Sequence, residues 1–185
     1  MTRTTAEQEL RQLLLQRSVT RGDFVLASGQ RSPYYIDART TTMSGAGLVL
    51  IGQLGLERLA ARGWAPRCIG GLTLGADPVA YAIALTARSR GRPIDAFTVR
   101  KASKGHGTSR RIEGCLAPGD TVVVVEDVIT TGASAQDAIA AVEAAGARVL
   151  GVLAVVDRAE GARERLQQGG HPVEALLTAA DLGLP

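Results

Sequence analysis

Two adjacent carboxylates followed by a hydroxyl-rich turn are the residues of this sequence best suited to chemistry. Glu126 and Asp127 come directly after four consecutive valines. The turn that follows consists of Thr130, Thr131, Gly132, Ala133 and Ser134 and leads into an alanine-rich segment. Carboxylates can accept hydrogen bonds from ribose hydroxyls, and a small turn at a helix N-terminus can hold a phosphate on its backbone amides. The segment is therefore predicted to bind a phosphorylated sugar.

An ordinary strand-to-helix connection with a small-residue turn is the structural alternative. Glu126 and Asp127 weigh against it, because adjacent acids at the end of a buried strand repel each other and lose hydration unless a cation or ligand lies near. The Walker pattern GxxxxGK[ST] is absent from the sequence. A nucleoside-triphosphate site of that type is therefore not expected.

The composition is typical of an aliphatic α/β protein. Of the 185 residues, 45% are apolar but only 3% are aromatic, so the core must consist of Val, Leu, Ile and Ala. The length suits one domain, and we expect a single domain over residues 1–185. The net charge of +3 is mild, and no nucleic-acid partner is expected.

Cysteines and the N-terminal segment indicate the compartment. Cys68 and Cys115 show no CxxC spacing, so each is expected to be a buried apolar thiol rather than part of a disulfide or metal site. The first residues predict an amphipathic helix without a signal-peptide core, and no apolar run reaches transmembrane length. The sequence therefore predicts a cytoplasmic protein with no membrane partner.

Helical and strand patterns alternate along the chain, which predicts an α/β fold with a mostly parallel central sheet covered by helices on both faces. The residues 1–40 are expected to form a small N-terminal hood over the carboxyl edge of this sheet. We expect residues 102–114 to form a polar loop. The expected helices are 6–17, 44–62, 75–88, 134–145 and 159–168, and the expected strands are 24–28, 34–37, 68–71, 94–100, 122–125, 148–157 and 173–177.

The segment 122–134 (VVVVEDVITTGAS) resembles the 5-phosphoribosyl-1-pyrophosphate (PRPP) motif of the type I phosphoribosyltransferases. That motif is an apolar strand, two acids, two apolar residues and a short Thr/Gly/Ser turn. The resemblance implies the Rossmann-like fold of that family. It also implies that Glu126 and Asp127 fix the ribose hydroxyls while residues 130–134 hold the 5′-phosphate.

The segment 24–37 (FVLASGQRSPYYID) narrows the resemblance. Tyr34 and Tyr35 are adjacent, so in a strand they face opposite sides and one of them can leave the core. An exposed ring beside backbone amides suits a flat heterocycle. The segment is similar to the pattern F-x-L-x-S-G-x-x-S-x-Y-[YF] of the orotate phosphoribosyltransferases, in which it holds the pyrimidine.

A basic run at 100–107 (RKASKGHG) is, by composition alone, a solvated loop. It also resembles the mobile catalytic loop of the same family, which implies that Arg100 binds substrate and that Lys101, Lys104 and His106 are catalytic. Cations and a protonatable histidine would stabilise the charge that develops on leaving pyrophosphate. In the family this loop reaches the partner subunit's site, which implies a homodimer that shares the 100–111 loop, with Lys101 and His106 supplied across it.

Other positions both support the resemblance and depart from it. Residues 70–75 match a turn that approaches pyrophosphate, and Arg158 matches an arginine that contacts orotate. Many family members have lysine where this chain has Ala27 and a Tyr-Lys pair at 73–74, where it has Thr-Leu. Compensating cations would have to come from elsewhere, and the candidates are Arg31, Arg39 and Arg100.

The resemblance implies transfer of phosphoribose from PRPP to orotate with Mg²⁺ as cofactor, held through PRPP near Glu126 and Asp127 with no direct protein ligand required. Thr130 favours a pyrimidine, because hypoxanthine–guanine enzymes carry an aspartate there that serves the purine as general base.

Two alternatives stay open. One is a phosphoribosyltransferase for another base, and the other is a PRPP-sensing regulator without catalysis.

Overall fold

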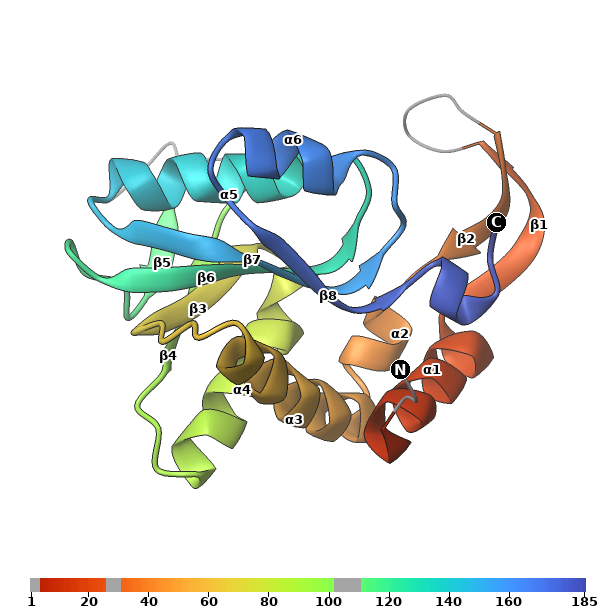
Figure 1. Cartoon of the computed structure of the whole chain (residues 1–185), viewed down its shortest axis with the longest axis horizontal. Coiled ribbons are helices and arrows are strands. Elements are labelled where there is room, and N and C mark those ends of the chain that lie inside the picture. The colour runs from red at the N-terminus through yellow and green to blue at the C-terminus, as the bar shows by residue number, and fades with distance from the viewer. Residues whose placement is uncertain (1–3, 26–30, 102–110) are drawn as a thin grey trace.

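A computed structural model of the chain describes residues 4–25, 31–101 and 111–185. Within them, one six-stranded sheet has the order β5-β4-β3-β6-β7-β8 (Figure 1). Its strands pair in parallel except for β5, which runs antiparallel to β4. The strands are β3 (Cys68–Leu72), β4 (Asp95–Val99), β5 (Ile112–Gly114), β6 (Thr121–Ile129), β7 (Arg148–Asp157) and β8 (Val173–Thr178).

Helices cover both faces of this sheet, as the sequence predicts. The helices α5 (Ala133–Ala144) and α6 (Ala162–Gln168) lie on one face, and α3 (Gly45–Ala61) and α4 (Ala76–Ser89) lie on the other (Figure 1). Consecutive side chains of a strand point to opposite faces. Val123 and Val125 accordingly pack on the α3–α4 side, Val122 and Val124 pack on the α5–α6 side, and all four are fully buried. The two-sided burial expected of the valine run is confirmed.

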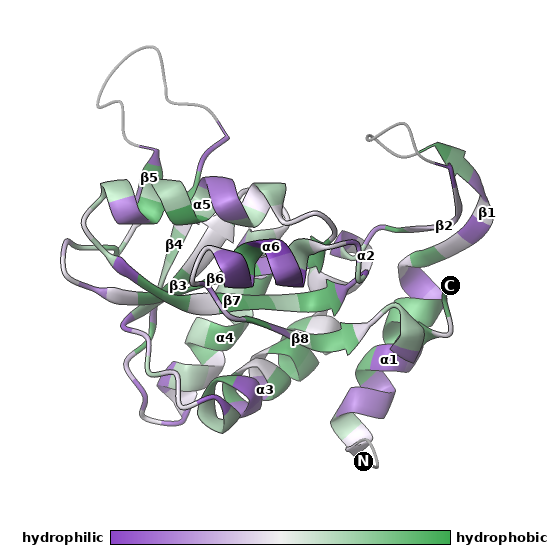
Figure 2. Cartoon of the chain, turned by 45° about the horizontal axis from the view of Figure 1, so that its top comes forward, coloured by the Kyte–Doolittle hydropathy of each residue, from purple (hydrophilic) through white to green (hydrophobic). Residues whose placement is uncertain are grey.

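The hood segment, residues 1–40, contains α1 (Thr5–Arg17) and the antiparallel hairpin of β1 (Val19–Val25) and β2 (Arg31–Ile36). Leu10 and Leu14 bury one side of α1 in the core. The short helix α2 (Arg39–Thr42) then connects the hairpin to α3. The arrowheads of β7 and β8 point toward α2 and β2 (Figure 2), so the hood lies at the carboxyl edge of the sheet.

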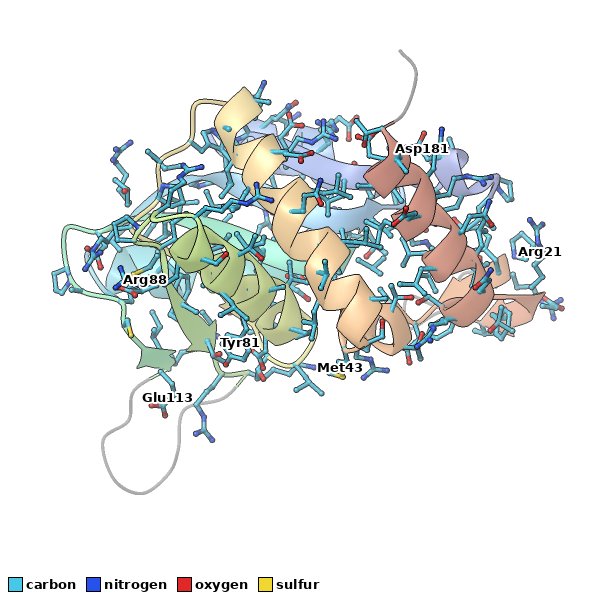
Figure 3. All side chains as sticks on the ribbon, turned by 90° about the horizontal axis from the view of Figure 1, so that it is seen from below. Arg21, Met43, Tyr81, Arg88, Glu113 and Asp181 are labelled. Atoms are coloured by element: carbon cyan, nitrogen blue, oxygen red, sulfur yellow. The ribbon has the colours of Figure 1, made fainter. Side chains whose placement is uncertain are left out.

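The C-terminal residues complete the hood. The 3₁₀ turn η1 (Ala180–Leu182) lies beside α1, and Figure 3 shows Asp181 at that position. Arg11 Nε donates to the Asp181 carbonyl oxygen, and the Tyr34 hydroxyl donates to the Pro185 carbonyl oxygen at 3.4 Å. These contacts join residues more than 150 positions apart in sequence.

Several sequence expectations need correction. Strand β6 does not end before the acids but continues through them to Ile129. A short strand, β5, occupies part of the expected loop, because its residues pair with β4. Helix α6 begins at Ala162 rather than at Ala159, since Ala159 and Gly161 have φ angles of 58° and 91°, which a right-handed helix excludes.

Three smaller expectations also differ. The first hairpin strand begins at Val19 rather than at Phe24, and positions 26–28 of the expected strand lie outside the described residues. Cys115 is exposed, so the expectation of a buried thiol holds for Cys68 alone; both thiols are free. The second hairpin strand begins at Arg31, three residues before its expected start at Tyr34. The remaining elements start and end within one residue of their expected limits. Among the described residues, no helix is long and apolar enough to span a bilayer.

Candidate active site

The site lies where the chain connections of the sheet diverge. The connection from β3 leads to β4 on one side, and the connection from β6 leads to β7 on the other, while β3 and β6 are neighbours. Such a switch point opens a crevice at the carboxyl ends of the strands, where α/β sheets bind ligands. Here a cavity of about 320 Å³ is lined by the hood, the turn after β3, the end of β6 and the residue that begins the basic loop. Its side chains include Tyr35, Arg39, Leu74, Lys101, Glu126 and Asp127.

Glu126 brings a buried carboxylate to this cavity. Its residue is only 6% exposed, and within the described part of the chain its Oε1 atom has no hydrogen-bond partner. Burial raises the pKa of Glu126 to about 8, repulsion from Asp127 adds to the increase, and Lys101 opposes it. A buried acceptor without a partner is costly unless a ligand satisfies it, so the carboxyl group of Glu126 is positioned to bind a polar ligand group.

Asp127 lies against the turn that follows β3. Its Oδ1 accepts a hydrogen bond from the backbone amide of Val128 at 2.9 Å. Burial raises the pKa of Asp127, although this backbone contact and the charge of Arg39 lower it. A Cβ atom at Gly75 would lie 2.4 Å from Asp127 Oδ1. Glycine at position 75 therefore allows the turn to approach the carboxylate.

The N-terminus of α5 forms the second part of the site. Gly132 precedes the helix with a φ angle of 81°, and no side chain caps the first turn. The uncapped amides and the helix dipole favour an anion at this end. A small cavity of about 50 Å³ is bounded by Glu126 and by residues 128–135. All five residues of the predicted phosphate turn, 130–134, line this cavity beside the acidic pair.

The turn after β3 is held by a polar network that the sequence did not reveal. Asp77 accepts hydrogen bonds from the Thr73 hydroxyl at 2.7 Å and from the Thr98 hydroxyl at 2.9 Å. The Tyr81 hydroxyl lies 3.1 Å from Thr98 Oγ1, and Figure 3 shows Tyr81 on the α4 side that faces β4. This network fixes the turn to the end of β4, from which the chain continues to Lys101.

The two tyrosines face opposite sides, as predicted. Tyr35 is 43% exposed and lines the larger cavity, whereas Tyr34 is buried. The guanidinium carbon of Arg158 lies 4.6 Å from the centre of the Tyr34 ring, and its Nη2 donates to Ser32 Oγ at 3.3 Å. Arg158 Nε also lies 2.8 Å from Glu160, without hydrogen-bond geometry. Tyr34 and Arg158 thus form a buried pair between β2 and the end of β7 and do not line the 320 Å³ cavity.

The predicted basic residues have different positions. Lys101 lines the chain's own cavity, whereas the resemblance implied that it is supplied across the dimer. Arg100 instead pairs with Glu113 at 3.6 Å and does not line the cavity. Lys104 and His106, as well as Ala27, lie outside the described residues.

Of two further charged residues of the cavity, Asp37 was missing from the predicted site and Arg39 was named only as a candidate compensating cation. Both line the cavity, and the Arg39 Nε and Nη2 atoms donate to the Asp37 carboxylate at 2.8 and 2.9 Å. The pair raises the pKa of Arg39 and lowers that of Asp37. The sequence signal that could have identified this pair is an acid and an arginine two positions apart, directly after the strand that contains Tyr34 and Tyr35.

Comparisons with known proteins agree with this geometry. No protein-family model matches the chain. An orotate phosphoribosyltransferase of Mycobacterium avium is 49% identical over 177 residues, which cover 96% of each protein. An orotate phosphoribosyltransferase of Aquifex aeolicus is 45% identical, with 95% of this chain and 96% of that protein covered.

Solved structures are similarly close. The orotate phosphoribosyltransferase of Mycobacterium tuberculosis in complex with PRPP has a TM-score of 0.82 and 45% identity, with 97% of this chain and 99% of that chain covered. A phosphoribosyltransferase from Corynebacterium diphtheriae has a TM-score of 0.86 and 41% identity, with 98% and 100% covered. With its parallel sheet, acidic pair and phosphate turn in the expected places, this chain belongs to the orotate phosphoribosyltransferase family.

Proposed function

We propose that the protein transfers the 5-phosphoribosyl group of PRPP to orotate, which gives orotidine 5′-monophosphate and pyrophosphate. The observation that carries this proposal is the acidic pair of buried Glu126 and partly buried Asp127 beside the uncapped N-terminus of α5, in one crevice at the switch point of the sheet. A phosphoribosyl group needs acceptors for its ribose hydroxyls and donors for its phosphate. This crevice provides both in adjacent cavities.

The acidic pair binds the sugar and favours its positive charge. As the bond from C1 to pyrophosphate breaks, charge develops on the ribose ring, and fixed carboxylates in a buried site stabilise that charge. Asp127 is held by the amide of Val128, so little reorganisation is needed during the reaction. The turn 130–134 and the first amides of α5 hold the 5′-phosphate.

Pyrophosphate leaves toward the turn after β3 and the basic residues. Lys101 lines the cavity and contributes charge from the chain's own subunit. Lys104 and His106 complete the catalytic loop in this proposal, on the basis of the family resemblance. Water exclusion follows when a loop of this kind closes over a bound substrate.

Magnesium is the proposed cofactor. The carboxylates of Asp37, Glu126 and Asp127 line the cavity, and carboxylate oxygens are the ligands that Mg²⁺ accepts. Within the described ranges, however, no cluster of three or more His, Cys, Asp or Glu residues is arranged to hold a metal alone. The donor set therefore fits an ion carried mainly by substrate oxygens, whose chemistry is to neutralise the charge of pyrophosphate.

Orotate recognition is assigned to the hood hairpin. Tyr35 offers a half-exposed ring at the cavity, supported by Phe24, whose ring centre lies 5.9 Å away. Tyr34 and Arg158 form the buried layer behind it, and contact of Arg158 with orotate stays a prediction. Thr130, in place of an aspartate, supports a base that needs no proton acceptor at that position.

The proposed active form is a homodimer in which part of the 100–111 loop reaches the partner's site. Mixing an Asp127→Asn protein with a Lys104→Ala protein tests the sharing of the loop. Heterodimers with one intact site would regain activity, and mixtures that stay inactive would contradict it. We also propose that the chain forms a single catalytic domain. A cytoplasmic location is proposed because it suits pyrimidine nucleotide synthesis.

The test of the proposed function is the ultraviolet absorbance of orotate in the presence of purified protein, PRPP and Mg²⁺, with and without EDTA. A PRPP-dependent loss that EDTA prevents, with orotidine 5′-monophosphate detected by mass spectrometry, is the expected result. Consumption of uracil or a purine in place of orotate would identify a different phosphoribosyltransferase. PRPP binding without consumption of any base would identify a sensor.

A further inference from the structure

Arg39, one of the three arginines proposed from the sequence to replace the missing lysines, lies in the substrate cavity. It belongs to α2, lies within the hood segment, and shares the cavity with Lys101, Asp127 and the turn after β3. It does not line the smaller cavity at the start of α5. Arg39 therefore faces the part of the site that is assigned to pyrophosphate rather than the part assigned to the 5′-phosphate.

The guanidinium group of Arg39 is held in a fixed orientation. Asp37 accepts hydrogen bonds from its Nε and Nη2 atoms. Among the described residues, no hydrogen bond involves Nη1, and the side chain is 47% exposed. A planar guanidinium anchored on one edge presents its three remaining N–H groups to a phosphate oxygen with little loss of side-chain entropy.

The helix that carries Arg39 is itself anchored to the hood. Ser18 Oγ, which is buried, lies 2.7 Å from Thr41 Oγ1 and 3.0 Å from Thr40 Oγ1. The Thr40 hydroxyl also donates to the carbonyl oxygen of Arg17 at 2.8 Å. A Cβ at Gly47 would lie 2.0 Å from the Thr41 carbonyl oxygen, so α3 also packs closely on α2. A rigid support of this kind is what a substrate-binding side chain requires.

Charge balance also calls for a cation at this position. Three acidic side chains line the cavity, namely Asp37, Glu126 and Asp127, of which Glu126 is protonated below about pH 8, while the proposed substrate and product are polyanions. Although burial is the main influence and raises the pKa of Asp127, the charge of Arg39 lowers that pKa, as expected for neighbours across the cavity. The lysines that many family members place at positions 27 and 74 are replaced by Ala27 and Leu74.

The other candidate arginines are directed elsewhere. Arg31 is 77% exposed, pairs with Asp23 at 2.9 Å and does not line the cavity. Arg100 pairs with Glu113 on the β4–β5 side. Of the three arginines proposed to compensate for the missing lysines, only Arg39 lines the cavity.

We infer that Arg39 binds the pyrophosphate group of PRPP and of the product, and that Asp37 orients its guanidinium for this contact. The inference rests on the proposed function, since pyrophosphate is the group exchanged in that reaction. Loss of one charge-assisted hydrogen bond to a phosphate oxygen is expected to weaken binding by about tenfold or more.

The test is isothermal calorimetry of pyrophosphate with Mg²⁺, on the wild-type protein and on Arg39→Gln. We expect the dissociation constant to rise about tenfold or more in Arg39→Gln, with partial recovery in Arg39→Lys. In steady-state assays the KM for PRPP should rise by a similar factor while the KM for orotate stays nearly constant. Arg67→Gln is the matched control, because Arg67 is similarly exposed and pairs with Asp95 at the amino end of β3 and β4.

Failure of the inference differs from failure of the proposed function. Pyrophosphate binding that is equal in Arg39→Gln and wild type, or absent from wild type, would overturn the role of Arg39. A wild-type protein that binds pyrophosphate through Arg39 but consumes no orotate would overturn the proposed function and leave the role of Arg39 intact. Equal melting temperatures of the three variants and the wild type would show that the effects do not arise from misfolding.

Discussion

The sheet side and the hood side of the site are built on different physical principles. On the sheet side, Glu126 and Asp127 lie within a strand whose four valines before them are fully buried, and the turn 130–134 leads directly into α5. On the hood side, Tyr35 and Arg39 come from a hairpin and a four-residue helix held by hydroxyl contacts. Burial of apolar strands fixes the first side, and the second combines buried side chains such as Tyr34, Ile36 and Ala38 with these hydroxyl contacts.

This difference suggests a division of labour. The phosphoribosyl group is common to substrate and product, and the residues assigned to it lie on the rigid sheet side. Orotate and pyrophosphate are the groups exchanged, and most residues assigned to them lie on the hood or on the basic loop.

The largest expected effect is on the sheet side, in Asp127→Asn. Loss of the carboxylate charge should lower kcat by about 10²-fold, since the oxocarbenium-like transition state loses a fixed negative charge. Folding should be little affected, because an amide retains the shape of the buried side chain and avoids the cost of its burial as an anion. The measurement is kcat together with the melting temperature.

The control for this prediction is Asp95→Asn, at the amino end of β4, where the carboxylate is 47% exposed. It should leave kcat unchanged. A drop in melting temperature that parallels the loss of rate in Asp127→Asn would show that Asp127 serves the fold rather than the reaction.

The second prediction concerns stability and pH through Glu126. Its pKa is about 8 in the folded protein, compared with an ordinary value of 4.5, with burial as the main cause. The stabilising contribution of the protonated group is thus full below about pH 4.5 and is lost as pH rises through about 8. Between these two pH values the free energy of unfolding should therefore decline less in Glu126→Gln than in wild type. The difference should be a few kcal/mol at most.

The check is the free energy of urea unfolding from pH 5 to pH 9 for both proteins. Wild type should lose stability relative to Glu126→Gln as pH rises. Two curves that stay parallel across the range would show that the carboxyl group of Glu126 has an ordinary pKa.

The same division explains what could be predicted from the sequence. Strand β7 (Arg148–Asp157) has the predicted bounds, and Glu126 lies beside the turn 130–134 in one cavity. Long apolar runs and α/β alternation determine these features locally. Glu126 and Asp127 belong to β6 instead of following it, because β6 continues to pair with β7 beyond the valines. The run of valines alone does not predict this pairing.

The hood was predicted less well, for physical reasons. Helix α2 has four residues and no apolar periodicity, so its existence depends on contacts of Thr40 and Thr41 with Ser18. Strand β5 needs β4 as its partner, and the position of Asp77 depends on hydroxyls from two other segments. Contacts between residues far apart in sequence determine all of these features.

A smaller effect is expected on the hood side, in Ser18→Ala. The change removes the hydroxyl that contacts Thr40 and Thr41 and should lower the free energy of unfolding by about 1–2 kcal/mol. The KM for PRPP should rise modestly as Arg39 loses support, while kcat stays nearly constant. Urea unfolding and steady-state kinetics provide both values.

A suitable control is Ser89→Ala, because the Ser89 hydroxyl donates only to the carbonyl of Thr86 within its own helix end. It should change neither quantity. If Ser18→Ala behaves like this control, the hydroxyl contacts do not hold the hood.

The most direct test of the division between the two sides is to compare orotate and ribose 5-phosphate in Tyr35→Ala. Tyr35 lines the cavity from the hood and is half-exposed, so its removal spares the core. The KM for orotate should rise about tenfold, as expected when a stacking ring is lost, while the dissociation constant for ribose 5-phosphate, measured by calorimetry, stays at the wild-type value. Weakening of both ligands to the same extent would contradict the division of labour between hood and sheet.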